Sequence, residues 1–412
     1  MKFTEYNLHP KVQKGLDALG FKRPTDIQYK AIPSILRGED VLAVAQTGTG
    51  KTAAFGIPLV QMVYRQKLAE TRQTGVKCII LAPTRELALQ ICDVIQSIAQ
   101  STSVTAVAIV GGVDQDPQIK ALEDRADIVI ATPGRMFDLI SQGHLKIHRV
   151  ETLILDEADY MLDLGFINDI KELVSRLPKR QQTLFFSATI NEKIKKIAYS
   201  IVKQSAIRIQ ISPKDPVAKT IEHFVMFMDM DHKRFFLERV VRENPDKKVL
   251  VFVRTKVRAD RVVAAMTRVD VKSECIHGDK SQDQRTAILD RFRNGDNMVL
   301  IATDITARGI DIPDVEIVVN YDLPEQAENY VHRVGRTGRS KQKGFAYAFC
   351  AEDEKSVLKK IQSFLHKDIQ EIKVNKTDYQ DTLNIERDRK NDYMSIVEDL
   401  ESYNKKKKKK RK

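Results

Sequence analysis

One stretch of the sequence decides the fold: Val41-Leu42-Ala43-Val44-Ala45-Gln46-Thr47-Gly48-Thr49-Gly50-Lys51-Thr52. An apolar run typical of a buried strand leads into glycines and then into helix-compatible residues. Glycines let backbone N–H groups close around phosphates, Lys51 would reach the outer phosphates, and Thr52 would offer its hydroxyl to Mg²⁺. We interpret the stretch as a phosphate-binding loop with Ala45 in place of the first glycine. The alternative is an ordinary glycine-rich turn.

The second half of such a site is an acidic residue that ends a hydrophobic strand. The run Leu153-Ile154-Leu155-Asp156-Glu157 supplies it. Asp156 would hold the hydration shell of Mg²⁺, and Glu157 would polarise the attacking water. An acidic pair after a strand is usually a solvated loop. Combined with the phosphate-binding loop upstream, it predicts a Mg²⁺-dependent phosphate site that activates water.

The order of apolar runs predicts the architecture. Short continuous apolar runs alternate with helix-like stretches, at 41–45, 76–82, 104–110, 127–131, 152–155 and 183–186, and again at 249–253, 271–276, 298–302, 315–320 and 345–350. This alternation is typical of parallel sheets covered by helices on both faces, so we expect an α/β protein with two such domains. We place the first at residues 1–207, a proline-containing linker at 208–220, the second at 221–375, and a charged, disordered tail at 376–412.

Charge and cysteine content restrict the partners and the compartment. Of the net charge of +12, residues 1–375 carry +8, residues 376–404 carry −4, and the last eight residues, all basic, carry +8. The basic end predicts a nucleic-acid tether, with a solubility tail as the alternative. Four cysteines that lie far apart, without a CxxC pair, support neither a zinc site nor a disulfide scaffold, and they favour a reducing compartment. With no apolar leader or 18-residue apolar run, we expect a cytoplasmic protein.

The motifs then match a family in order and spacing. Asp156-Glu157-Ala158-Asp159 spells the name of the DEAD-box RNA helicases, and the chain resembles that family from about residue 3 to residue 370. The other matching stretches are Gly20 to Gln28, Ala82 to Leu87, Gly111-Gly112, Thr132 to Arg135, Ser187-Ala188-Thr189, Val251 to Thr255, His277 to Asp279, Gln284-Arg285, Ala302 to Asp304, Ala307 to Asp311 and His332 to Arg339. One departure is Asp26, at a position that is often apolar or proline in this family. The resemblance implies two tandem RecA-like domains and a bacterial-type protein.

The resemblance also assigns roles to residues of the ATP site. The catalytic residues it implies are Lys51, Asp156, Glu157 and the arginine fingers Arg336 and Arg339. It implies nucleotide contacts by Phe3, Arg23, Gln28, Ala45, Gln46, Thr47, Gly48, Thr49, Gly50, Lys51, Thr52 and Asp311, with Gln28 on the adenine edge and Phe3 stacked on the base. Mg²⁺ would be held through Thr52 and Asp156. Asp159, Ser187, Thr189 and His332 would couple the two domains.

RNA would be the polymer partner. The resemblance implies that it is held without base reading by Pro83, Thr84, Arg85, Gly112, Thr132, Arg135, Thr255, Gly278 and Thr303. It implies an RNA-stimulated ATPase that separates short duplexes locally or remodels RNA–protein complexes. A DNA-translocating helicase and an ATP-gated RNA clamp or annealing protein are the alternatives. We expect a monomer, and ribosome assembly and RNA decay both stay open as its setting.

Overall fold

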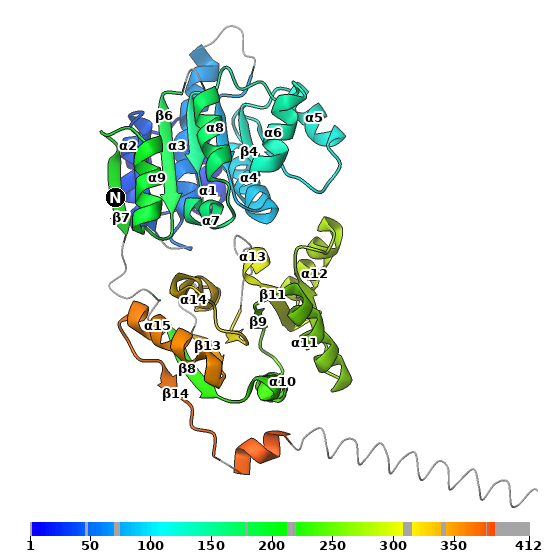
Figure 1. Cartoon of the computed structure of the whole chain (residues 1–412). Coiled ribbons are helices and arrows are strands. Elements are labelled where there is room, and N and C mark those ends of the chain that lie inside the picture. Colours follow the sequence, from blue (N-terminus) through cyan, green and yellow to red (C-terminus); the bar gives the residue numbers. More distant parts are fainter. Residues whose placement is uncertain are drawn as a thin grey trace, which may run out of the picture. The chain divides into compact units, whose positions relative to one another are not determined.

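The computed structural model of the chain describes residues 2–45, 48–69, 75–177, 180–211, 217, 220–307, 315–338, 343–375 and 377–383 (Figure 1). The chain divides into two compact units, unit 1 up to residue 216 and unit 2 from residue 217. Gln46, Thr47, Asp311, Arg339, the proline-containing part of the expected linker and residues 384–412 lie outside the described residues. Within the described ranges, no helix combines the length and the apolar composition needed to cross a membrane.

Unit 1 is built on a seven-stranded sheet in which all pairings are parallel, in the order β3-β4-β2-β5-β6-β1-β7. The strands are β1 (Val41–Ala45), β2 (Cys78–Leu81), β3 (Ala106–Ile109), β4 (Ile128–Ala131), β5 (Thr152–Leu155), β6 (Gln182–Ser187) and β7 (Ile207–Ile211). The helices are η1 (Phe3–Tyr6), α1 (Pro10–Ala18), α2 (Asp26–Leu36), α3 (Lys51–Ala69), α4 (Arg85–Ala99), α5 (Asp116–Glu123), α6 (Pro133–Ser141), α7 (Ala158–Asp163), α8 (Ile167–Arg176) and α9 (Glu192–Ile201).

The apolar runs form strands because both faces of this sheet are covered. Along β2, Ile80 packs into one core with helices α1 to α4, whereas Ile79 and Leu81 pack into a second core with helices α6 to α9. Side chains alternate between the two faces of a strand, so a sheet with helices on both faces needs an apolar residue at every position. This explains why continuous apolar runs, rather than alternating ones, marked the strands in the sequence.

Unit 2 repeats the design with a second seven-stranded parallel sheet, in the order β10-β11-β9-β12-β13-β8-β14. The strands are β8 (Ile221–Phe227), β9 (Val249–Val253), β10 (Glu274–Ile276), β11 (Val299–Thr303), β12 (Ile317–Asn320), β13 (Gly344–Cys350) and β14 (Gln370–Glu371). The helices are η2 (Met230–His232), α10 (Lys233–Arg242), α11 (Lys256–Arg268), α12 (Gln282–Asn294), α13 (Asp304–Ala307), α14 (Ala327–Val334), η3 (Glu352–Glu354) and α15 (Lys355–Leu365). The α/β fold class is therefore confirmed.

The structure adds elements that the apolar runs did not reveal. Strands β7, β8 and β14 each contain solvent-exposed residues, and polar residues interrupt or replace the apolar run in their sequences. Residues 377–383, which the sequence assigned to the charged tail, are helical. Within them, the Tyr379 hydroxyl lies 2.8 Å from Nδ1 of His232, and the buried Thr382 accepts a hydrogen bond from Arg239. A few side-chain contacts thus order the start of a mostly polar segment.

Candidate functional site

The glycine-rich turn connects the end of β1 to the start of α3. Gly48 and Gly50 have φ angles of +82° and +90°, which residues with a Cβ rarely adopt. The turn opens the 19-residue helix α3, whose first backbone N–H groups have no intrahelical acceptor. A helix N-terminus of this kind attracts anions through those N–H groups and the helix dipole. Ala45 ends β1 at 1% exposure, and Thr49 and Thr52 are partly exposed beside the turn.

Lys51, the first residue of α3, is charged but almost completely enclosed. Its exposed fraction is 6%, and its Nζ atom has no hydrogen-bond partner among the described residues. The Asp156 carboxylate attracts this ammonium but forms no hydrogen bond with it. A buried ammonium without hydrogen-bond acceptors is costly. The side chain therefore fits a site where an anion such as a phosphate supplies the missing partner.

Asp156 follows β5 and is also buried, at 2% exposure. Its Oδ1 accepts a hydrogen bond from the backbone N–H of Glu157 at 3.0 Å. Burial raises the pKa of Asp156 to about 6, with a further rise from Glu157, although the Lys51 ammonium lowers it. A carboxylate that is costly to ionise in this environment would be stabilised by a divalent cation. The oxygen donors present, a carboxylate and the Thr52 hydroxyl, are of the hard type that Mg²⁺ prefers.

Glu157 is the residue before helix α7 and has the left-handed conformation, with φ +50° and ψ +48°. This conformation is uncommon for a residue with a Cβ and is a small store of strain at an otherwise regular strand end. The side chain is 8% exposed. The turn thus places two acidic residues in succession at the carboxyl end of β5. Strand β6 lies between β5 and β1 in the sheet.

Gln28 contacts the phosphate-binding turn directly. Its Oε1 accepts from the Thr25 backbone N–H at 3.0 Å, and its Nε2 donates to the Gly50 carbonyl at 3.2 Å. The Thr25 hydroxyl donates to the Thr49 carbonyl at 2.8 Å. Thr25 and Gln28 form a capping box at the start of α2, a Thr-x-x-Gln signal that our sequence interpretation missed. A Gln amide still has one N–H and one lone pair free for a ligand.

Phe3 and Arg23 have contrasting surroundings. The Phe3 ring is 1% exposed and packs nearly edge-on against Phe21, with ring centroids 5.7 Å apart. Arg23 lies in the exposed segment before α2. Stacking of Phe3 on a base stays a prediction, and in this structure its ring belongs to the core of unit 1.

The proposed coupling residues of unit 1 are connected by hydrogen bonds. Asp159 accepts from the backbone N–H of Thr189 at 3.1 Å and from the Thr189 hydroxyl at 3.0 Å. Ser187 ends β6, and its hydroxyl donates to the Thr189 carbonyl at 2.7 Å. The last residue of the Asp-Glu-Ala-Asp stretch is thus tied to the Ser-Ala-Thr stretch. His332, the fourth predicted coupling residue, lies on α14 of unit 2.

The proposed RNA contacts of unit 1 gather around one loop. Arg85, the first residue of α4, covers Gly112, where an added Cβ would lie 2.0 Å from the Arg85 Nη1 atom. Gly112 has φ +73°. Arg135, on α6, donates to the carbonyl of Val113 at 2.9 Å. Two arginines from different helices thus hold the loop that follows β3.

Helix N-termini surround this loop. Thr84 is the N-cap of α4, where its hydroxyl accepts from the Leu87 N–H at 3.3 Å, and Thr132 is the N-cap of α6. Pro83 is buried just before α4. Strands β3, β4 and β2 are neighbours and parallel, so the turns at their carboxyl ends lie along one edge of the sheet. This edge offers backbone N–H groups and hydroxyls suited to phosphates.

The corresponding residues of unit 2 also follow neighbouring strands. Thr255 is the N-cap of α11 after β9, and Gly278 follows β10. Thr303 ends β11, and its Oγ1 lies 3.0 Å from that of Thr306. Strands β10, β11 and β9 are adjacent and parallel, so these three residues share one sheet edge.

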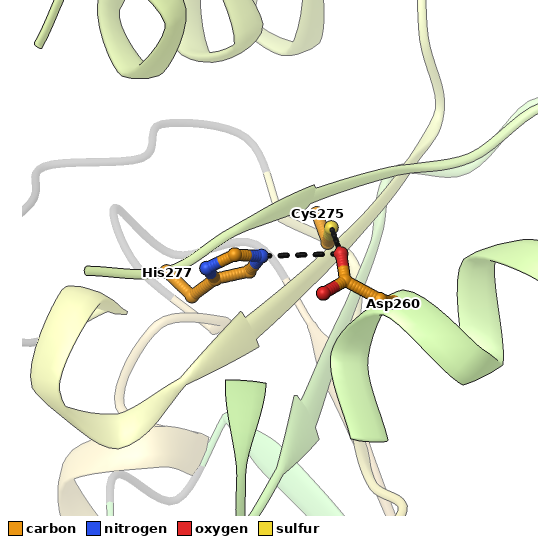
Figure 2. Close-up of side chains that lie close together, drawn as sticks. All are labelled: Asp260, Cys275 and His277. Carbon is orange, nitrogen blue, oxygen red and sulfur yellow. Dashed lines mark hydrogen bonds and ion pairs between the residues drawn. The ribbon is translucent and has the colours of Figure 1, made fainter. Parts of the chain in front are cut away.

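Beside Gly278 lies a group of potential metal ligands that the sequence did not suggest. The group consists of Asp260, Cys275 and His277. Each residue contributes one ligand atom, and the three atoms lie within 4.8 Å of one another (Figure 2). Our sequence interpretation considered only multi-cysteine spacings, and a helix residue paired with two strand residues has no such signal.

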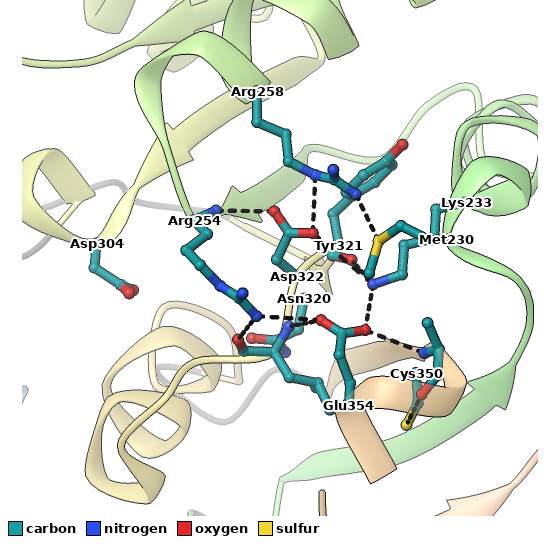
Figure 3. A network of polar contacts seen from close by, with 12 residues as sticks. Met230, Lys233, Arg254, Arg258, Asp304, Asn320, Tyr321, Asp322, Cys350 and Glu354 are labelled. Carbon is teal, nitrogen blue, oxygen red and sulfur yellow. Dashed lines mark hydrogen bonds and ion pairs between the residues drawn. The ribbon is translucent and has the colours of Figure 1, made fainter. Parts of the chain in front are cut away.

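A network of buried charges occupies the carboxyl edge of the second sheet (Figure 3). Lys233 is completely buried, contacts the Glu354 carboxylate and donates to the Tyr321 carbonyl at 2.7 Å. Asp322 lies 3.8 Å from the Lys233 Nζ and 2.9 Å from the Arg258 Nε. The members come from distant parts of the sequence, so no local pattern predicted them.

The arginines of the His332 to Arg339 stretch differ in their surroundings. Arg333 is 2% exposed and binds both carboxylate oxygens of Asp304, with Nε–Oδ1 and Nη2–Oδ2 distances of 2.6 and 2.8 Å. Its Nη1 also donates to the Asp322 carbonyl at 2.6 Å. Arg336 is 4% exposed and follows α14. Arg333 is therefore a structural clamp within unit 2, a role that our sequence interpretation did not assign.

Together the two parallel α/β units, the first with a phosphate-binding turn and an acidic strand end, define a nucleotide hydrolase of the tandem RecA-like class. The family models agree: DEAD/DEAH box helicase matches residues 25–197, and the helicase conserved C-terminal domain matches residues 232–341. The chain is 39% identical to the ATP-dependent RNA helicase CshA of Listeria monocytogenes. The 371 aligned residues cover 90% of this chain and 70% of that relative.

A second relative and a solved structure extend the likeness. The DEAD-box ATP-dependent RNA helicase CshA of Geobacillus kaustophilus is 38% identical over 371 residues, 90% of this chain and 78% of that relative. The structure resembles S. cerevisiae Dbp5 bound to RNA and ADP BeF3, with a TM-score of 0.80 and 31% identity over 93% of this chain and 98% of that chain. The chain belongs to the DEAD-box family of ATP-dependent RNA helicases, and its bacterial-type character is confirmed.

Proposed function

We propose that unit 1 binds ATP through the phosphate-binding turn, with the Lys51 ammonium on the outer phosphates. The observation that carries this proposal is the buried Lys51 Nζ, which has no hydrogen-bond partner in the part of unit 1 that the structure describes. Thr52 and Asp156 would hold Mg²⁺, which when bound neutralises charge on the phosphates. Glu157 would accept a proton from the attacking water, because its carboxylate follows Asp156 at the same strand end.

We further propose that hydrolysis needs residues of both units. Negative charge increases on the transferred phosphoryl group, and arginine side chains stabilise it. Arg336 and Arg339 are the proposed source, and Asp311 is the proposed ribose contact. Gln28 is proposed to read adenine with the N–H and the lone pair that its contacts with Thr25 and Gly50 leave free.

RNA is the proposed partner, held along the sheet edges at the RNA-contact residues of both units. In unit 1, Arg85 lies against Gly112 and Arg135 donates a hydrogen bond to the Val113 carbonyl, so two arginines contact the loop that would bind RNA. Contacts of this kind bind phosphates and sugars and do not read bases. The S. cerevisiae protein with a similar structure is described as bound to RNA and ADP BeF3, which supports this assignment.

The coupling of ATP use to RNA is proposed to be local strand separation or remodelling of RNA–protein complexes. Binding of ATP and RNA to the same closed state would make each ligand strengthen the other. Asp159, Ser187, Thr189 and His332 are the proposed coupling residues, and the bonds from Thr189 to Asp159 support the first three. We also propose a cytoplasmic monomer that acts in ribosome assembly or RNA decay. The four cysteines are free and buried, as suits a reducing compartment.

The proposal is tested by measuring ATP hydrolysis without polymer, with single-stranded RNA and with single-stranded DNA of the same sequence. We expect strong stimulation by RNA and little by DNA. Equal stimulation by DNA would favour a DNA-translocating helicase. Unwinding of a short RNA duplex, compared with the lifetime of the complex on single-stranded RNA, then distinguishes a helicase from an RNA clamp or annealing protein.

A further inference from the structure

The group formed by Asp260, Cys275 and His277 lies where the fold concentrates three different donor atoms. Cys275 is on β10, which ends at Ile276, and His277 is the next residue. The side chains of Cys275 and His277 face the same side, because both lie within hydrogen-bond distance of the Asp260 Oδ1 atom. Helix α11 packs over β10 and contributes Asp260 (Figure 2). The topology thus brings a thiol, an imidazole and a carboxylate to one point.

The distances suit a tetrahedral metal ion. The Asp260 Oδ1 atom lies 3.2 Å from the His277 Nε2 and 3.3 Å from the Cys275 Sγ. Ligand atoms around a tetrahedral Zn²⁺, with bonds of about 2.0 to 2.3 Å, stand roughly 3.3 to 3.7 Å apart. Two of the three distances between the ligand atoms are thus close to the tetrahedral range, and the third, from the Cys275 Sγ to the His277 Nε2, is within 4.8 Å.

Burial and access also fit. The side chains of Cys275 and His277 are almost fully buried, whereas that of Asp260 is 59% exposed. Strand β10 lies at the edge of the sheet, so an ion could enter past Asp260 and keep water as a fourth ligand. The pair of soft and borderline donors, sulfur and imidazole nitrogen, favours Zn²⁺ over Mg²⁺ or Ca²⁺.

We propose that Asp260, Cys275 and His277 form a binding site for Zn²⁺, separate from the ATP site. On binding, the Cys275 thiol loses its proton to solvent and the sulfur bonds the metal. The neutral His277 ring carries its proton on Nδ1, and its Nε2 lone pair bonds the metal. The ionised Asp260 bonds through Oδ1. One proton is released for each ion bound.

One local feature opposes the metal. Burial, and then the hydrogen bond to Asp260, raise the pKa of the Cys275 thiol to about 11, so the ion has to displace a thiol proton.

The experiment is a Co²⁺ titration of the full chain followed by visible and near-ultraviolet absorption. We expect one Co²⁺ per chain, with thiolate-to-cobalt charge-transfer bands and tetrahedral d–d bands. Cys275→Ser should lose the charge-transfer bands, and Asp260→Asn should weaken binding at least about 10-fold. Cys350→Ser, at another buried cysteine of unit 2, is the matched control and should behave as wild type.

Folding of each variant is checked by thermal unfolding without metal. Because Asp260 is on the surface, Asp260→Asn keeps the test valid if Cys275→Ser fails to fold. Zn²⁺ should raise the unfolding midpoint of the wild type and not that of Asp260→Asn, since only the state with the formed site binds the ion. An absence of charge-transfer bands in the wild type at saturating Co²⁺, or identical bands in Cys275→Ser, would overturn the proposal.

Discussion

Two buried lysines, Lys51 in unit 1 and Lys233 in unit 2, show how differently the two units use charge. Lys233 is completely buried and contacts Glu354, Asp322 and the Tyr321 carbonyl. Lys51 is 6% exposed, and its ammonium has no hydrogen-bond partner among the residues that the structure describes. A buried charge with its partners in place holds a fold together, whereas one without them is retained at a cost in stability. Unit 1 thus keeps a charge for a ligand, and unit 2 uses its charges internally.

The largest expected effect is on ATP turnover, and it should distinguish Arg336 from Arg333, which lies three residues earlier. Arg336→Ala should lower the turnover of ATP by about 10³- to 10⁵-fold, because a catalytic arginine stabilises the transferred phosphoryl group. Binding of an ATP analogue should change little. Single-turnover hydrolysis and analogue binding are the two measurements. Arg333→Gln is the contrasting variant, since it breaks the Asp304 clamp and should destabilise unit 2. An unchanged turnover number in Arg336→Ala would remove the finger assignment.

Lys233→Met should cost the next largest amount, about 3 kcal/mol of folding free energy, because the buried Glu354 carboxylate loses its fully buried cation while Asp322 keeps Arg258. Chemical denaturation measures this loss. Lys355→Met is the matched control, because Lys355 pairs with Glu352 on the surface and should contribute less than about 1 kcal/mol. Equal costs for the two variants would contradict a structural role for the buried network.

Gly112→Ala should have a moderate effect confined to RNA. A Cβ there would collide with the Arg85 guanidinium and would sit at φ +73°, a conformation that costs about 1 to 2 kcal/mol for a non-glycine residue. The displaced loop should weaken RNA affinity several-fold and leave ATP hydrolysis without RNA unchanged. Gly143→Ala, with a similar φ of +80° and open space around its Cβ, is the control. Equal RNA affinity in both variants would show that the loop does not contact RNA.

The last expected effect is on folding stability, and it appears only below pH 7. Burial, and then the Lys367 charge, lower the pKa of His223 to about 4. The unfolded chain binds the proton at a pKa of about 6.5, so this residue makes unit 2 less stable as the pH falls from about 6.5 to 4. The difference between these two pKa values lowers the unfolding free energy by at most about 3 kcal/mol at pH 4, and the effect is absent above pH 7. His223→Gln should make the pH dependence of the unfolding free energy shallower in this range. An identical dependence would contradict a neutral, buried His223.

The sequence predicted the features whose residues are close in the chain. The phosphate-binding turn, the acidic strand end and the apolar strands are local patterns, so they could be recognised and placed on a parallel sheet. The capping box of Thr25 and Gln28 was also local, and we missed it because Gln28 already had a proposed role on the base. The Lys233–Glu354 pair joins residues 121 positions apart, and no periodicity or motif connects them. The distinct environments of Arg333 and Arg336 likewise depend on tertiary packing.

The most direct test measures thermal unfolding of wild type and Lys51→Met, each with and without an ATP analogue and Mg²⁺. The unliganded midpoint of Lys51→Met should stay close to that of the wild type, because relief of a buried ammonium without a hydrogen-bond partner offsets the loss of its attraction to the Asp156 carboxylate. The analogue should raise the midpoint of the wild type only, and ATP hydrolysis should fall at least about 100-fold in the variant. A lower unliganded midpoint in Lys51→Met, with equal stabilisation of both proteins by the analogue, would contradict a lysine kept for phosphate.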